Sequence, residues 1–360
     1  LVDASLMLKR DGSGKFNLPD FSRTGGGQEA SIPALPVSIS NGAMHYTDET
    51  RKFTTSIKDI KADVSNPDAS GSVEFSLKAK THGSRRRNLF ADGVYSPKDN
   101  RYGITLKLDG LDTAHYGNYA LSLTSNSRRI VVKTGLLGAE MRFENGAEPS
   151  GTVRLSGAEL EAAGLARPLT DVSARVKLSG RFLVEDASAT YGTTAASASG
   201  WIGFGTDPAM DMKIHAKSDD LRELSGFLKP LKTRSIAGAG EGIVRFTGRP
   251  SSPAYSAFLK AQNLSLDGLF LSSAAITLKG DKRAVEIVHS GLELWKGAGW
   301  VKGVIDVEKG KLTLIGGVEG FRFASAARLL GLADAGGTGS AQFTAGGTLD
   351  IVAKDLHLAC

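Results

Sequence analysis

The sequence has a single cysteine, Cys360, at its last position. No disulfide can therefore form within the chain, and no metal site can be built from thiolates. The six histidines are scattered, and no two of them stand at the spacing of metal ligands. We expect neither a disulfide framework nor a metal, and nothing in the sequence indicates a cofactor.

Long apolar runs are also missing. No segment approaches the run of about 18 apolar residues that a membrane-spanning helix needs. No signal peptide is recognisable, and the chain begins at Leu1 instead of a methionine. We expect a fragment of a longer protein, and no segment of this fragment is expected to span a bilayer.

Local signatures of catalysis are absent as well. The serine-hydrolase elbow Gly-x-Ser-x-Gly does not occur. The glycine-rich stretch Gly238–Gly242 is followed by Ile243–Phe246, which reads as a strand, whereas a dinucleotide-binding loop opens a helix. We therefore expect that the protein is not an enzyme.

Charge of one sign is not concentrated in the chain. The 44 Lys and Arg residues nearly balance the 38 Asp and Glu residues, which leaves a net charge of +6. A nucleic-acid binder usually gathers its basic residues, and only Arg85–Arg87 does so here. This triplet is more typical of a solvated loop than of a phosphate or headgroup site, so no nucleic-acid partner is expected.

The dominant positive signal is alternation of apolar and polar residues between frequent glycines. Ile104, Leu106 and Leu108, for example, fall at period two and so share one side of a strand. Asn41-Gly42 between alternating segments predicts a hairpin turn. Because helical spacing is rare, we predict an all-β, mainly antiparallel fold with a few short helices.

A repeat of about 100 residues organises the second half of the chain. Ser173–Gly180 matches Ser273–Gly280 (273 − 173 = 100), and Gly200-Trp201-Ile202 matches Gly299-Trp300-Val301 (299 − 200 = 99). Such repeats indicate an array that works through an extended surface and not through one catalytic pocket.

The repeat suggests four parts. Residues 1–150 form an N-terminal β segment with a loop at 22–31. Residues 151–250 form a β repeat with a short helix near 218–231. Residues 251–347 form a second repeat with a short helix near 321–332, and residues 348–360 begin a further, truncated one.

An antiparallel sheet with one apolar face must cover that face, either with a second sheet or with an external apolar ligand. An open-ended array can curl into an elongated, open apolar groove instead of closing on itself. Its medium-sized side chains would suit acyl chains. The predicted groove lining is Val153, Leu155, Val176, Leu178, Met210, Met212, Ile214, Val285, Ile287, Ile305, Val307, Leu312 and Leu314.

Several segments resemble the AsmA/TamB family of bacterial envelope proteins, which belong with the bridge-like lipid transfer proteins. Leu6–Gly12 with Phe16–Leu18 is similar to the family's early strand and turn, and Leu35–Asp48 is similar to its strand, Asn-Gly, strand segment. Gly164–Val172 is similar to its internal repeats. The likeness covers most of the chain and is weakest over residues 80–150.

The resemblance implies a periplasmic β-groove, anchored in the inner membrane, that conducts phospholipid toward the outer membrane. It also implies an outer-membrane β-barrel partner, bound through regions absent here. Two alternatives remain open. One is a periplasmic scaffold for outer-membrane protein assembly, which would recruit strands at exposed sheet edges. The other is a surface β-solenoid adhesin with a closed, dry core.

Overall fold

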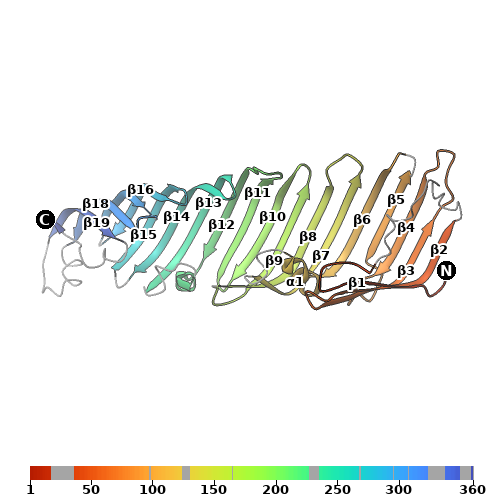
Figure 1. The fold of residues 1–360 in the computed structure, drawn as a ribbon. Helices are drawn as coiled ribbons and strands as arrows, with labels where there is room; N and C mark the ends of the chain where they lie inside the picture. Colours follow the sequence, from red (N-terminus) through yellow and green to blue (C-terminus); the bar gives the residue numbers. More distant parts are fainter. Residues whose placement is uncertain are drawn as a thin grey trace. The chain divides into compact units, whose positions relative to one another are not determined.

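The computed structural model describes residues 1–17, 36–96, 99–123, 130–163, 165–226, 235–266, 269–294, 296–306, 308–322, 337–348 and 358–359. The chain divides into two compact units. Unit 1 comprises Leu1–Ala163 and Thr170–Phe182, and unit 2 comprises Gly164–Leu169 and Leu183–Cys360. Each unit is built from strands that lie side by side in sequence order (Figure 1).

In unit 1, the first two strands pair in parallel, and each strand from β2 to β7 then pairs antiparallel with the next. The strands are β1 (Ser5–Arg10), β2 (Val37–Asp48), β3 (Phe53–Val64), β4 (Val73–Lys80), β5 (Leu89–Ser96), β6 (Arg101–Asp112), β7 (Ile130–Glu144), β8 (Ser150–Ala162) and β9 (Leu169–Leu178).

In unit 2, each strand from β11 to β19 pairs antiparallel with the next. The strands are β10 (Arg181–Tyr191), β11 (Thr194–Gly203), β12 (Met210–Ser218), β13 (Ile236–Arg249), β14 (Ser252–Leu266), β15 (Leu269–Gly280), β16 (Ala284–Leu294), β17 (Gly297–Asp306), β18 (Lys311–Arg322), β19 (Thr338–Thr348) and β20 (Leu358–Ala359).

Strand positions recur at the interval of the sequence repeat. β15 begins 100 residues after β9 (269 − 169), β18 begins 101 after β12 (311 − 210), and β19 begins 102 after β13 (338 − 236). Six strands therefore separate equivalent positions. The all-β, mainly antiparallel fold is confirmed, and the sheet is not closed.

Two helices lie within the described residues: α1 (Thr113–Ser122) and the 3-10 helix η2 (Leu221–Gly226). η2 falls inside the range 218–231 predicted to hold a short helix, while 227–234 lie outside the described residues. Of the range 321–332, Phe321 and Arg322 end β18 and the remainder lies outside. The loop predicted at 22–31 and most of the truncated repeat at 348–360 also lie outside the described residues.

The predicted hairpin at Asn41-Gly42 is wrong. β2 continues through this dipeptide as one strand, and its pairing with β3 shifts register between Ile39 and Gly42. Asn41 has a φ of 57° and donates a side-chain hydrogen bond to Asp3. A left-handed asparagine here makes a β-bulge, which needs the same backbone conformation as a turn.

Helix α1 was not predicted from the sequence. Its N-cap is Asp112, whose side chain accepts hydrogen bonds from the backbone N–H of Ala114 (2.8 Å) and His115 (3.3 Å). Asn118 ties the helix to β7, because its amide both accepts from Val132 N (2.8 Å) and donates to Val132 O (2.7 Å). The helix therefore packs against the unit-1 sheet through its polar side chains as well as its aromatic ones.

The aromatic contacts of α1 surround a buried carboxylate. Tyr119 stacks on Phe53 with ring centroids 4.0 Å apart, and its hydroxyl donates to Asp48 (3.0 Å). Asp48 is fully buried and also accepts from Arg10 Nη1 (3.1 Å) and Arg51 N (3.1 Å). Burial alone would raise the pKa of Asp48, but these hydrogen bonds outweigh it and hold the pKa below its ordinary value.

This arrangement predicts an acid-sensitive contact. Because the pKa of Asp48 is lower in the folded protein than the ordinary 3.8, its stabilising effect is present above that value and is lost as pH falls through the folded pKa. We expect Asp48→Asn to lower the melting temperature at neutral pH and to flatten its fall between about pH 5 and about pH 3. Thermal unfolding followed by near-ultraviolet circular dichroism of the tyrosines would measure the melting temperature at neutral pH and its dependence on pH. Asp99→Asn, at an exposed turn, is the control, and an equal effect there would contradict the assignment.

Glycines stand where large side chains of the neighbouring strand cross. A Cβ on Gly316 would lie 2.4 Å from the Phe343 ring and 2.7 Å from Trp300 O. A Cβ on Gly93 would lie 2.7 Å from the Phe75 ring. In each case the glycine is directly opposite the aromatic residue in the pairing. A missing side chain on one strand thus makes room for a ring on the next.

We expect Gly316→Ala to destabilise the protein by about 1–3 kcal/mol, because the added methyl overpacks the site under Phe343. The matched control is Gly346→Ala, where a Cβ would come no closer than 3.8 Å to Leu312 O. Urea denaturation should separate the two variants. Equal midpoints would show that the sheet relaxes around the methyl group.

Candidate functional site

Residues directly opposite each other in an antiparallel pair point to the same face of the sheet. Tracing these partners across unit 2 joins residues that lie far apart in the sequence. One unbroken row crosses eight strands, from β12 to β19. It runs through Met212, Phe246, Tyr255, Gly280, Val285, Ile305, Leu312 and Gly347.

A second row lies two residues along each strand and so shares the face of the first. It crosses the same eight strands and contains no polar side chain. It runs through Ile214, Val244, Ala257, Leu278, Ile287, Gly303, Leu314 and Ala345. We call the surface formed by the two rows the apolar face.

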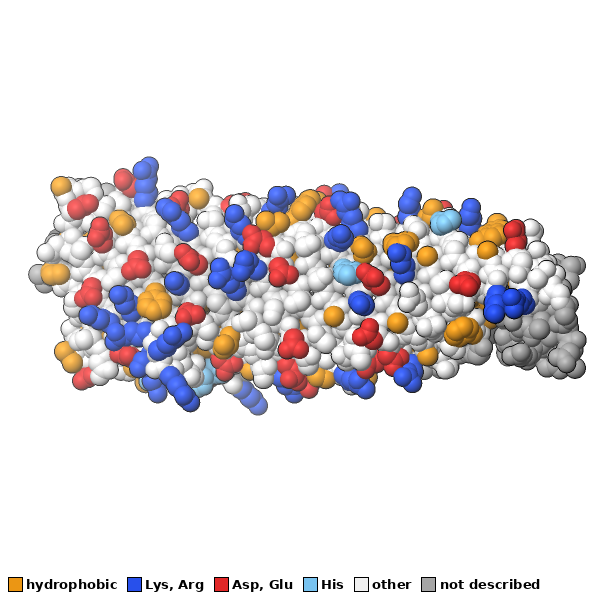
Figure 2. All heavy atoms as spheres, turned by 180° about the vertical axis from the view of Figure 1, so that it is seen from behind, with side chains coloured by type: hydrophobic (Ala, Val, Ile, Leu, Met, Phe, Trp, Pro, Cys, Tyr) orange, Lys and Arg blue, Asp and Glu red, His pale blue; other side chains and the backbone are white. Residues whose placement is uncertain are grey.

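The residues between the rows point the other way and are mostly polar. The row that begins at Lys213 and lies between the two apolar rows consists mainly of charged residues, residues with a hydroxyl group and one glycine. Val304 is its one apolar side chain. The row runs through Lys213, Arg245, Ser256, Lys279, Glu286, Val304, Thr313 and Gly346. Figure 2 shows one side of the molecule, on which charged side chains of both signs are spread and hydrophobic ones are scattered. Along this row, the polar face therefore differs from the apolar face in chemistry, while Ile243, Phe258 and Ile315 add apolar side chains elsewhere on the polar face.

The predicted lining residues of unit 2 that the structure describes fall on the apolar face. Seven belong to the two rows, and Met210 is the neighbour of Met212 two residues along β12. Leu312 is buried at 6% exposure, and the other seven are half-buried. Val307 lies outside the described residues.

Unit 1 has an apolar face of its own, which includes Val153 and Leu155. Val153 ends a row of apolar partners that begins at Ala79, and Leu155 stands opposite Leu137. The row that begins at Ala79 runs through Ala79, Leu89, Leu108, Ala139 and Val153. Val176 and Leu178 lie two residues apart on one side of β9, and both are half-buried.

Sequence reasoning missed about half of each row. Val244 and Phe246 on β13, Leu278 on β15 and Phe343 near the row on β19 all follow the same alternation. Their strands contain many alanines and glycines, which dilute the pattern. The sequence repeat already matches Phe343 with Phe246, 97 residues apart (343 − 246), but a match between repeats does not show on which face a side chain lies.

In the described parts of the sheet, only two short helices lie against these faces: α1 in unit 1, and η2 in unit 2, where Leu221 reaches β13 at Gly240. Unit 2 contains a small cluster of buried hydrophobic residues. It consists of Val318 and Phe321, with Leu294 and Ala341 packed against them. A closed sandwich would bury the rows at the level of Leu312, yet most row members keep partial exposure. Within the described residues, the apolar face therefore keeps part of its surface exposed.

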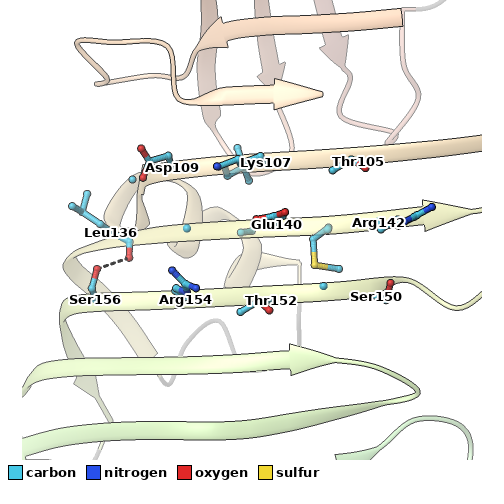
Figure 3. Close-up of a pocket in the computed structure, with 16 residues that line it drawn as sticks. Thr105, Lys107, Asp109, Leu136, Glu140, Arg142, Ser150, Thr152, Arg154 and Ser156 are labelled. Carbon is cyan, nitrogen blue, oxygen red and sulfur yellow. Dashed lines mark hydrogen bonds between the residues drawn. The ribbon is translucent and has the colours of Figure 1, made fainter. Parts of the chain in front are cut away.

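A polar hollow of about 690 Å³ lies on β6, β7 and β8, on the face of the sheet opposite to the unit-1 apolar face (Figure 3). Its charged side chains include Lys107, Glu140 and Arg154, and Ser156 Oγ donates to Leu136 O at 3.4 Å. No histidine or cysteine lines it, so its hydroxyls lack the partner that usually activates a nucleophile. Its chemistry is that of a solvated strand surface.

Metal binding has no support in the described ranges, where no three His, Cys, Asp or Glu side chains gather closely enough to hold an ion. Within the same ranges, no helix has the length and apolar character needed to cross a membrane. Comparison of the chain with protein-family models, curated proteins and solved structures finds no match. The resemblance to the AsmA/TamB family therefore remains a prediction.

Proposed function

We propose that the protein is a non-enzymatic phospholipid carrier whose apolar face holds acyl chains out of water. The observation that supports this most directly is the pair of uninterrupted rows across β12 to β19, which contain no charged side chain. A row that crosses eight strands at a spacing of about 4.8 Å is roughly 34 Å long, more than an extended acyl chain needs.

The energy of such binding is sufficient. Each lipid methylene removed from water contributes about 0.8 kcal/mol, so a chain of roughly 16 carbons gains on the order of 10 kcal/mol when fully covered. A face that covers only one side of the chain gains a fraction of this. Binding of that strength keeps a lipid out of water and still permits exchange along the face.

The lining favours movement over a fixed pose. Its side chains are Val, Ile, Leu and Met interspersed with Gly and Ala, with Phe246 and Tyr255 as the aromatic members of the rows. No hydrogen-bonding group of the second row would pin a headgroup at one position. A uniform surface of this kind has similar affinity at successive strands, which is what a conduit between two membranes requires.

The cellular setting is part of the same proposal and rests on the family resemblance. It comprises a periplasmic location, an inner-membrane anchor, transport toward the outer membrane and an outer-membrane β-barrel partner. The anchor and the partner would act through regions beyond this sequence.

Native mass spectrometry of the purified chain, followed by organic extraction and lipid analysis, tests the proposal. We expect several phospholipids per chain. A lipid-free, monodisperse and stable protein would instead favour the assembly scaffold or the adhesin.

A pair of adjacent substitutions tests the face itself. Ile305→Asp places a carboxylate within the first row, whereas Val304→Asp places the same group on the opposite face, where Val304 is 45% exposed. Because an unpaired charge is costly beside acyl chains, we expect Ile305→Asp to reduce the extracted phospholipid roughly tenfold and Val304→Asp to leave it unchanged.

Circular dichroism and melting temperatures of both variants complete the comparison. If Ile305→Asp unfolds while Val304→Asp does not, the position belongs to a closed core and the carrier proposal fails at that strand. Met212→Asp with Lys213→Asp repeats the design on β12, where the two residues again point to opposite faces.

A further inference from the structure

The polar face of unit 1 carries lysines that oppose each other. In the pairing of β3 with β4, Lys58 stands directly opposite Lys80, and Lys61 stands directly opposite Lys78. Like charges at directly opposite positions of a sheet destabilise it. Lys80 has a counter-charge in Asp59, whereas the Lys61–Lys78 pair has no ion-pair partner among the described residues.

Counter-charges reach only part of this cluster. Asp59 binds both Lys80 (3.2 Å) and Arg87 (2.7 Å), and Asp109 binds Arg86 (3.2 Å). Two arginines of the Arg85–Arg87 triplet are thus engaged within unit 1. The Arg85–Arg87 triplet, which is the basic cluster visible in the sequence, is therefore largely neutralised by carboxylates of unit 1.

The available charge lies on the strands. Among the described residues, Lys58, Lys61, Lys78 and Lys107 make no ion pair, and all four are exposed; Glu140 stands directly opposite Lys107. Lys107 belongs to the same surface, because Phe90 on β5 stands opposite both Lys78 and Lys107. We call these four lysines the lysine strip. Lys and Arg side chains gather over the N-terminal strands in Figure 2.

The dimensions of the strip point to a charged surface and not to a single small anion. It extends over four adjacent strands, β3 to β6, and is therefore about 14 Å wide at about 4.8 Å per strand. No buried polar group converges on one point within it. Phe90, the aromatic residue between the lysines, is half-buried and offers little ring for a base to stack on.

We propose that the lysine strip docks unit 1 on the surface of an anionic phospholipid bilayer. Each lysine held near such a surface is attracted to its headgroups, and the four act together. This surface lies on the opposite side of the sheet from the unit-1 apolar face and does not require that face to bind lipid. Docking leaves the apolar face free.

Co-sedimentation with vesicles tests the docking. The full chain is mixed with vesicles of phosphatidylcholine alone, or of phosphatidylcholine with about one third phosphatidylglycerol. We expect binding to the anionic vesicles only, weakening as salt is raised, because exposed charges are screened. Equal binding to both vesicle types, or binding that salt does not weaken, would overturn the proposal.

The triple variant Lys58→Gln, Lys61→Gln, Lys78→Gln should bind anionic vesicles roughly 100-fold more weakly, which corresponds to about 1 kcal/mol per lysine. The control removes three exposed lysines of unit 2, Lys213→Gln, Lys282→Gln and Lys302→Gln, and so lowers the net charge equally. It should change binding by less than about threefold. Equal losses in both variants would show that net charge alone is responsible and would contradict the strip.

Two further readouts keep the result interpretable. The melting temperature of the strip variant should hold or rise, since the opposing lysines are neutralised. Its extracted phospholipid should be unchanged, so that failure of docking and failure of the carrier function are separate outcomes. If the wild type binds single-stranded DNA more tightly than anionic vesicles at the same salt, and the strip variant loses that binding, the surface is one for nucleic acid and the proposal is wrong.

Discussion

Hydrogen bonding of each strand to the next in sequence is the constraint on which the other properties of this protein depend. It fixes which side chains stand opposite one another, and the period of two then sends every second set to the same face. A slip of one residue at any pair from β12 to β19 would exchange the apolar row for the polar one beyond that point. The continuity of both faces thus depends on seven successive registers being kept.

The fold class followed from the sequence because alternation is a local signal, carried within each strand. A short motif that is compatible with two different backbone structures, such as a turn and a β-bulge, was less informative. Asn41-Gly42 was expected to reverse the chain, but β1 lies beside β2 and Asn41 bonds to Asp3, so the left-handed residue bends a continuous strand. Helix α1 has a capping aspartate, Asp112, yet its stability comes from contacts with Phe53 and Val132, which are distant in the sequence.

The site was predictable to the extent that single strands reveal it. Met212 and Ile305 could each be assigned to an apolar side, but their membership in one row depends on five successive strand pairings through four intermediate residues. Gly280 within that row has no hydrophobic character of its own, and only pairing reveals that it keeps the surface apolar. The lysine strip was hidden for the same reason, because Lys61 and Lys78 become neighbours only through the register of β3 and β4.

Pairing in strict sequence order also governs how such a sheet can change in length. Because each strand from β12 to β19 pairs with the strand before it and the strand after it, removal of two consecutive strands would bring together strands that still run in opposite directions. Removal of one strand would leave two parallel neighbours joined by a connection too short for them. Lengthening or shortening by hairpins preserves both faces, and the six-strand spacing between equivalent strands is an even number that meets this rule.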